Sequence, residues 1–143
     1  MNANTSDYVI QAVEGVDPVH LVELLFQRAV RDLETAKEAW GSPPQSPETI
    51  RLVVHAQSII TELHHCLNYE EGGRLARDLG RLYEYMQYRL MESVTSVSEE
   101  GLQALSEVLN LLSSLSDAWC ELSRRQADLT LVGAQADGKF LVA

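Results

Sequence analysis

Apolar residues recur every three or four positions along most of the chain, which is the spacing of one face of an α-helix. The first regular run follows Asp17-Pro18, where a capping oxygen and then a proline favour a helix start. Residues 41–47, GSPPQSP, interrupt the pattern, and Ser46-Pro47 repeats the start signal. The pattern therefore predicts one helix over residues 17–40 and a second from about Glu48 to about Asn68.

Two more helices are expected in the second half of the chain. Gly72-Gly73 marks a break before a third helix from about Arg74 to about Ser93, and a fourth runs roughly from Glu99 to Gln126. Short connections between long helices favour antiparallel neighbours. We therefore predict an all-α protein, an antiparallel up-down four-helix bundle. Its parts are an apolar N-terminal arm (residues 1–16), a single-domain bundle (17–126) and a short, flexible or partly docked C-terminal extension (127–143).

The third helix divides into two stripes at about 100° per residue. We expect one stripe to form core, with Tyr83 at its flank: Leu75, Leu79, Leu82, Met86 and Leu90. The roughly opposite stripe carries arginines and tyrosines: Arg74, Arg77, Arg81, Tyr85 and Tyr88. This second stripe is either a solvated face or a partner-binding surface, since Arg and Tyr are enriched among residues that dominate binding energy.

The fourth helix carries more apolar surface than one bundle core needs. Its apolar columns span about 200° at the helical repeat, whereas a bundle helix needs an apolar stripe of roughly 100° or a little more. The columns are Leu105, Leu112, Trp119; Val108, Leu115, Leu122; Ala104, Leu111, Ala118; with Leu102 and Leu109. The chain's own ends, a second subunit or a partner's amphipathic helix would cover the excess. A wide core that buries all of it is the alternative.

Charge and hydropathy exclude several classes of function. The formal net charge is -10, which disfavours nucleic-acid binding because such proteins need a basic field to displace phosphate counterions. The sequence has neither an 18-residue apolar run nor the basic and apolar start of a secretory signal. We therefore expect a cytoplasmic protein with no stable membrane insertion.

Motifs for catalysis or metal binding are weak. Glu62 and His65 have the Glu-x-x-His spacing of carboxylate-bridged metal bundles, but those sites need a second such motif and further glutamates. His20 and His55 do not supply one. Nucleotide-binding loops and hydrolase nucleophile motifs do not occur. We expect no catalytic residue, no metal and no cofactor, so the chain is not predicted to be an enzyme.

Residues 56–90 resemble the signature segment of the flagellar secretion chaperone FliS family. Ala56–Leu63 fits the pattern A-x-x-I-I-x-x-L, and an acidic loop with two glycines follows. Leu79–Leu90 fits L-x-x-L-Y-x-Y-M-x-x-R-L, and LLSSLSDAW (residues 111–119) resembles the family's fourth-helix ending. The resemblance covers about residues 8–122. It departs on the first helix, where the family commonly has LYDGA and this chain has LFQRA from Leu25 to Ala29.

The resemblance implies a cytosolic type III export chaperone. Such a protein binds the C-terminal segment of flagellin, prevents its premature polymerisation and assists its delivery to the flagellar export apparatus, with the export gate as a further partner. Within that interpretation we expect these residues at a flagellin groove: Ile59, Leu63, Tyr83, Met86, Leu111, Leu115, Tyr85 and Arg81. Tyr8 and Val13 of the arm would act as a self-cap. The alternatives are a homodimer that uses the same apolar strip and a metal-dependent bundle enzyme.

Overall fold

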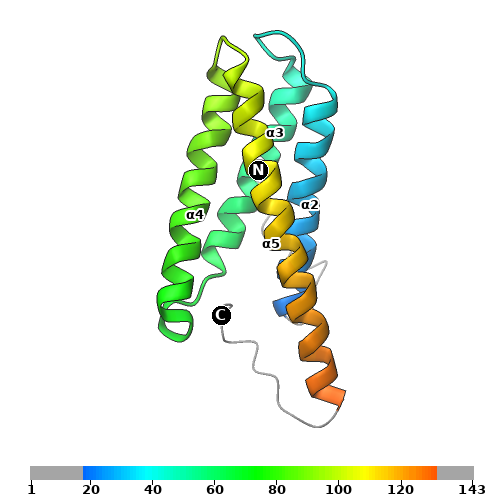
Figure 1. Cartoon of the computed structure of the whole chain (residues 1–143), viewed down its shortest axis with the longest axis vertical. Helices are drawn as coiled ribbons and strands as arrows, with labels where there is room; N and C mark the ends of the chain where they lie inside the picture. Colours follow the sequence, from blue (N-terminus) through cyan, green and yellow to red (C-terminus); the bar gives the residue numbers. More distant parts are fainter. Residues whose placement is uncertain (1–17, 132–143) are drawn as a thin grey trace, which may run out of the picture.

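The computed structural model describes residues 18–131, with side chains to residue 125. In this part of the chain there are four helices: α2 (Pro18–Glu38), α3 (Pro47–His65), α4 (Tyr69–Thr95) and α5 (Glu100–Leu131). Consecutive helices run in opposite directions, and each packs against two neighbours in the ring α2–α3–α4–α5 (Figure 1). The predicted all-α, up-down four-helix bundle is confirmed.

Polar caps fix where α3 and α4 begin. The Ser46 hydroxyl accepts a hydrogen bond from the Thr49 backbone N–H at 3.1 Å, and Pro47 is the first helical residue. This confirms the cap-then-proline start, because a proline at that position loses no helical hydrogen bond. The Asn68 side chain caps α4 by accepting from the Glu71 N–H at 3.1 Å. The predicted cap at Asp17 lies outside the described residues.

The helix ends differ from the predictions at three places. The second helix ends at His65 and not near Asn68, because the Asn68 side chain caps the next helix. The expected break at Gly72-Gly73 falls inside α4, where one helical turn precedes Gly73 with φ 53° and ψ -128°. That backbone conformation suits glycine alone. The fourth helix continues to Leu131, beyond the predicted end at Gln126.

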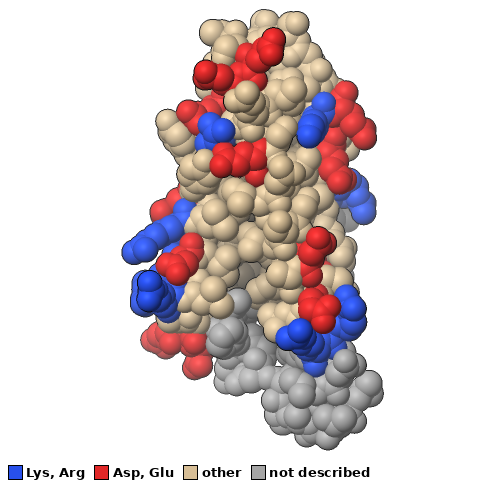
Figure 2. Space-filling view, viewed as in Figure 1, with Lys and Arg blue, Asp and Glu red and all other residues tan. Residues whose placement is uncertain are grey.

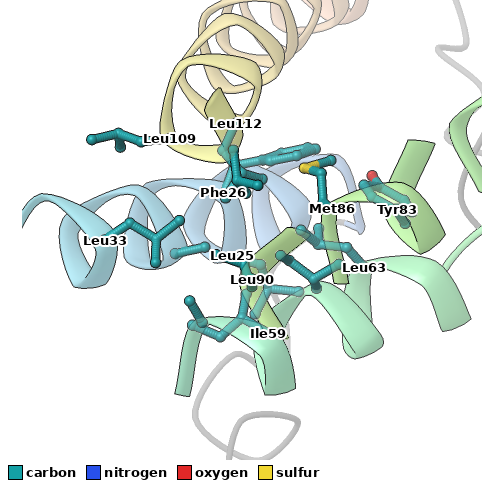
Figure 3. Close-up of a cluster of buried hydrophobic side chains, with 14 of the residues drawn as sticks. Leu25, Phe26, Leu33, Ile59, Leu63, Tyr83, Met86, Leu90, Leu109 and Leu112 are labelled. Carbon is teal, nitrogen blue, oxygen red and sulfur yellow. The ribbon is translucent and has the colours of Figure 1, made fainter. Parts of the chain in front are cut away.

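The core lies where the inward faces of all four helices meet (Figure 3). It includes fully buried side chains from every helix: Phe26, Leu33, Ile60, Leu63, Met86, Leu90, Leu105 and Leu112. Trp119 extends this core along α5. Its indole N–H donates to the Val19 carbonyl at 2.9 Å, and its ring packs against Phe26 with centroids 6.1 Å apart. Trp119 therefore ties the second half of α5 to the first turn of α2.

The predicted core stripe of α4 is partly wrong. Tyr83, expected at the flank, is 2% exposed and belongs to the core with Met86 and Leu90. In contrast, Leu75 is 46% exposed, and Leu79 and Leu82 are only half-buried: both pack against the edge of the core. The small residues Ala76 and Gly80 occupy the buried stripe instead, and the leucines lie toward α5.

A buried carboxylate joins α2 to α3. Asp32 is 4% exposed, and its Oδ2 atom lies 2.5 Å from Nδ1 of His55. Arg28, one turn before Asp32, approaches the other carboxylate oxygen at 3.5 Å. Because a buried carboxylate needs polar partners to remain stable, this contact fixes how α2 and α3 pack.

Candidate functional site

Uncovered apolar surface gathers along the seam between α4 and α5. The α4 side carries Leu75, Leu79 and Leu82, and the α5 side carries Leu111, Leu115 and Leu122. We call this set of six leucines the α4–α5 furrow. Each of the six remains half-buried or exposed in the structure. On the fourth helix, Leu122 is 39% exposed, and Leu111 and Leu115 are half-buried at the edge of the core.

A polar cluster closes the furrow at the end nearer the α4–α5 turn. The Tyr85 hydroxyl lies 2.8 Å from both carboxylate oxygens of Glu107, and Arg89 Nε donates to Glu107 Oε1 at 2.7 Å. Arg89 also donates to Glu92 at 2.8 Å. The Arg89 guanidinium and the Tyr85 hydroxyl hold the pKa of the Glu107 carboxyl below its usual range. We call these four residues the polar clamp, and they hold α4 against α5.

Helical geometry places the furrow leucines on the sides of α4 and α5 that carry the polar clamp. Leu82 and Leu75 precede Arg89 by seven and fourteen residues, so at about 100° per residue they lie on nearly the same side of α4. Leu111 and Leu122 follow Glu107 at distances that place them on the clamp side of α5. On both helices, leucines therefore continue the clamp side of the helix, farther from the α4–α5 turn than the clamp itself.

A small recess forms the floor of the furrow. It has a volume of about 10 Å³ and is lined by residues from all four helices and the α3–α4 connection: Val22, Leu63, Cys66, Leu67, Leu79, Tyr83 and Trp119. Burial raises the pKa of the Tyr83 phenol and also that of the Cys66 thiol. Both groups are therefore neutral at physiological pH, and the floor is an uncharged surface.

Charged side chains flank the furrow without crossing it. Figure 2 shows an uncharged central strip, hollowed in its lower half, between charged groups on either side. On α4 the exposed Arg81 approaches Asp78 at 3.7 Å, and on α5 both Arg124 and Arg125 approach Glu121, at 3.5 and 3.4 Å. An apolar strip with polar rims is the usual layout of a protein-binding surface.

A larger cleft lies at the opposite end of the bundle. It measures about 780 Å³ and lies between the α2–α3 loop and the α4–α5 turn, where Trp40, Val97 and Leu102 contribute apolar surface. Most of its other lining residues are polar or charged, among them Lys37, Ser98, Glu99 and Gln103. It lacks a continuous row of leucines along two helices, so the furrow is the better candidate for an amphipathic partner.

The predicted site residues fall into four groups. Ile59, Leu63, Tyr83 and Met86 lie in the core and are at most 7% exposed, although Leu63 and Tyr83 also reach the recess. Leu111 and Leu115 lie half-buried in the furrow, whereas Tyr85 and Arg81 are exposed on α4. Tyr8 and Val13 lie outside the described residues. Contact of any of these residues with a partner stays a prediction.

Sequence reasoning missed the polar clamp and half of the furrow. Arg89 and Glu107 are 18 residues apart on different helices, so their contact depends on how α4 and α5 align. Leu75, Leu79 and Leu82 continue the helical period of the core, so the sequence predicts them there, and their place at the furrow is a finding of the structure. The available signal was the width of the apolar arc, which indicates uncovered surface without locating it.

The candidate metal pair, Glu62 and His65, is not part of a larger group of possible metal ligands among the described residues. Glu62 is half-buried on α3 and His65 is exposed at its end. Within the described part of the chain, no group of three or more His, Cys, Asp or Glu side chains could hold a metal ion. Among the same residues, no helix has the length and hydropathy needed to cross a bilayer.

Comparisons with known proteins identify relatives over most of the chain. The family model "Flagellar protein FliS" matches residues 1–126. Flagellar secretion chaperone FliSB of Pseudomonas aeruginosa is 38% identical over 78% of this chain and 85% of its own length. Flagellar secretion chaperone FliS of Salmonella typhimurium is 32% identical over 80% of this chain and 83% of its own. Flagellar secretion chaperone FliS of Vibrio cholerae is 26% identical over 82% of this chain and 84% of its own length.

Proposed function

Because this chain belongs to the flagellar protein FliS family, we propose that it is a flagellar secretion chaperone that binds the C-terminal segment of flagellin in the cytoplasm. The α4–α5 furrow is the observation that carries this proposal. Leucine side chains that one bundle leaves uncovered suit a stoichiometric binding protein, whereas a catalyst would need converging polar groups. The relatives that are named as chaperones support the same conclusion.

The furrow has the dimensions of a short helix. From Leu111 to Leu122 the distance along α5 is about 16 Å at 1.5 Å per residue, or three helical turns. A client helix with apolar residues at i, i+3, i+4 and i+7 would cover leucines on both α4 and α5. The polar clamp would end the apolar contact, since inserting an apolar side chain there would break hydrogen bonds to Glu107.

The proposed role has two further parts, and both depend on the furrow covering the client's apolar face. A flagellin segment held in the furrow cannot pack against other flagellin subunits, which prevents premature polymerisation. The same complex would be delivered to the flagellar export apparatus, with the export gate as a second partner. Each step is binding, with no bond made or broken and no cofactor.

The binding test compares two leucines of α5 that have nearly equal exposure. Leu122, 39% exposed, lies in the furrow, and Leu102, 36% exposed, lies in the cleft beyond the clamp. In calorimetry with the flagellin C-terminal segment we expect a 1:1 complex, and circular dichroism should gain helical signal as the segment orders. Leu122→Ser should weaken binding about five- to tenfold, and Leu102→Ser should have little effect.

The outcomes separate this function from the alternatives. A defect confined to Leu102→Ser would place the client in the cleft, and no binding by the wild-type chain would refute the chaperone role. Sedimentation of the chain alone tests the homodimer, which predicts association that depends on concentration. A monomer at all concentrations would exclude it.

The self-cap proposal for Tyr8 and Val13 requires a separate variant. Deletion of residues 1–16 should leave the bundle folded and leave flagellin binding tighter or unchanged, because the arm would compete for the same apolar surface. Helicity measured by circular dichroism and affinity measured by calorimetry are the two readouts. Loss of folding on deletion would contradict the self-cap.

A further inference from the structure

A side-chain hydrogen bond joins α3 to α4 at the corner between them. The Tyr69 hydroxyl and His64 Nε2 are hydrogen-bonded at 3.1 Å. Both atoms lie over Gly80, where a Cβ atom would come within 2.8 Å of the hydroxyl and 3.2 Å of the imidazole nitrogen. The contact therefore links the end of α3, the start of α4 and the third turn of α4. We call it the Tyr69 latch.

The corner is a small unit with a hinge on one side. Asn68 caps a single helical turn, Tyr69–Gly72, and the Gly72 N–H donates to the Asn68 carbonyl at 2.8 Å. Gly73 follows with φ 53° and ψ -128°, so the backbone kinks there. A turn bounded by a cap and a glycine kink can rotate as a body about Gly73, because few residues need to change conformation.

The same corner forms one wall of the recess in the furrow floor. Cys66 and Leu67 line the recess together with Leu79 and Trp119, and Leu67 Cδ1 lies 3.7 Å from the position of a Cβ atom on Gly80. The recess has a volume of about 10 Å³, which is close to the space needed for one water molecule. It cannot admit a leucine or phenylalanine side chain in this conformation.

We propose that the recess is a side-chain pocket with a hinged wall. Release of the Tyr69 latch moves the turn about Gly73 and carries Leu67 away from Leu79, so that one large apolar side chain of the client enters. This inference rests on the proposed function and names the regulation of that site. The latch suits the purpose because Tyr69 is 46% exposed: a solvent-accessible hydrogen bond adds to the apolar packing of Cys66 and Leu67 against the core, and its loss shifts an opening equilibrium by roughly three- to tenfold.

Two substitutions break the latch in different ways. Tyr69→Phe removes the hydroxyl and keeps the ring, and Gly80→Ala displaces the hydroxyl with a methyl group. The clash in Gly80→Ala is with the end of a flexible side chain, and alanine is the better helix former, so α4 should remain folded. Tyr88→Phe is the matched control, since Tyr88 is a tyrosine of the same helix that is 62% exposed.

Amide hydrogen exchange of the full chain without client tests the latch directly. The Leu67 N–H donates to the His64 carbonyl at 3.2 Å, between the moving segment and α3, and therefore reports the opening. The N–H groups of Glu71 and Gly72 donate to Asn68 inside the moving turn and serve as internal references. We expect both variants to exchange three- to tenfold faster at Leu67 but not at Glu71 or Gly72, and the double variant to match the single ones. Tyr88→Phe should exchange as the wild type does.

The association rate of the flagellin C-terminal segment tests whether the opening matters for binding. If the pocket must open first, both latch variants should associate about three- to tenfold faster, with Tyr88→Phe unchanged. Unaltered exchange, or faster exchange with unaltered association, would overturn the proposal. If the wild-type chain did not bind the segment, the proposed function itself would fail, and the exchange experiment would still report on the latch.

Discussion

Replacement of Trp119 by phenylalanine tests how α5 is held beside the furrow. The substitution removes the indole N–H that donates to the Val19 carbonyl at 2.9 Å, in a side chain that is 9% exposed. A buried hydrogen bond of this kind contributes about 1 kcal/mol. The smaller ring also loses packing against Phe26 and the recess, worth about 0.5–1 kcal/mol. We therefore expect Trp119→Phe to lower the free energy of unfolding by about 1.5–2 kcal/mol.

Urea denaturation followed by circular dichroism measures this loss. The slope of the free energy of unfolding against urea concentration should stay unchanged. In a chain of this length the melting temperature should fall by about 4 °C per kcal/mol. Trp40→Phe is the matched control: Trp40 is half-buried, and its indole nitrogen has no hydrogen-bond partner among the described residues. If Trp119→Phe cost no more stability than Trp40→Phe, the Val19 contact would not hold α5 and the reasoning would be refuted.

Three further predictions follow from other contacts. Gly73→Ala should cost about 1–2 kcal/mol in urea denaturation because the backbone has positive φ there; an unchanged midpoint would contradict the kink. The lowered pKa of Glu107 means that the clamp stabilises the fold above the unfolded-state pKa, near 4.5, and that this stability is lost as pH falls through the lower folded-state pKa. The loss should be at most about 1 kcal/mol, since Glu107 is partly exposed, and Glu107→Gln should abolish this part of the pH dependence of stability. Arg81→Glu and Tyr85→Ala should leave the bundle folded by circular dichroism, so that a calorimetric defect in flagellin binding would report contact; normal binding by both would place the client away from the outer face of α4.

Local signals in the sequence were sufficient for the existence of the helices. The apolar period of three to four residues and the Ser46-Pro47 start each act within a few residues, and the structure confirms the elements that they predict. The glycines before Arg74 mark a kink inside α4 and not its start. The end of α3 was misplaced because Asn68 could either extend one helix or cap the next. That choice depends on the side-chain bond to the Glu71 N–H.

The candidate site was only partly predictable. The width of the apolar arc on the fourth helix indicated apolar surface beyond the buried core, and Leu111 and Leu115 lie half-buried at its edge. The partner of Arg89 could not be predicted, because Glu107 is reached only when α4 and α5 have a defined alignment. The same holds for Tyr69, whose contact with Gly80 depends on the bend at Gly73.

The sequence alone determined that this protein is a bundle of four amphipathic helices with more apolar surface than its core can bury. The tertiary structure decided which apolar stripe of α4 is core. Tyr83 and Met86 are buried, and Leu75 and Leu79 face the furrow. Helical periodicity could not make that choice, because two adjoining stripes have the same spacing and differ only in which one meets the neighbouring helices. The small residues Ala76 and Gly80 let α4 turn that stripe inward, and this leaves the leucines at the edge of the core.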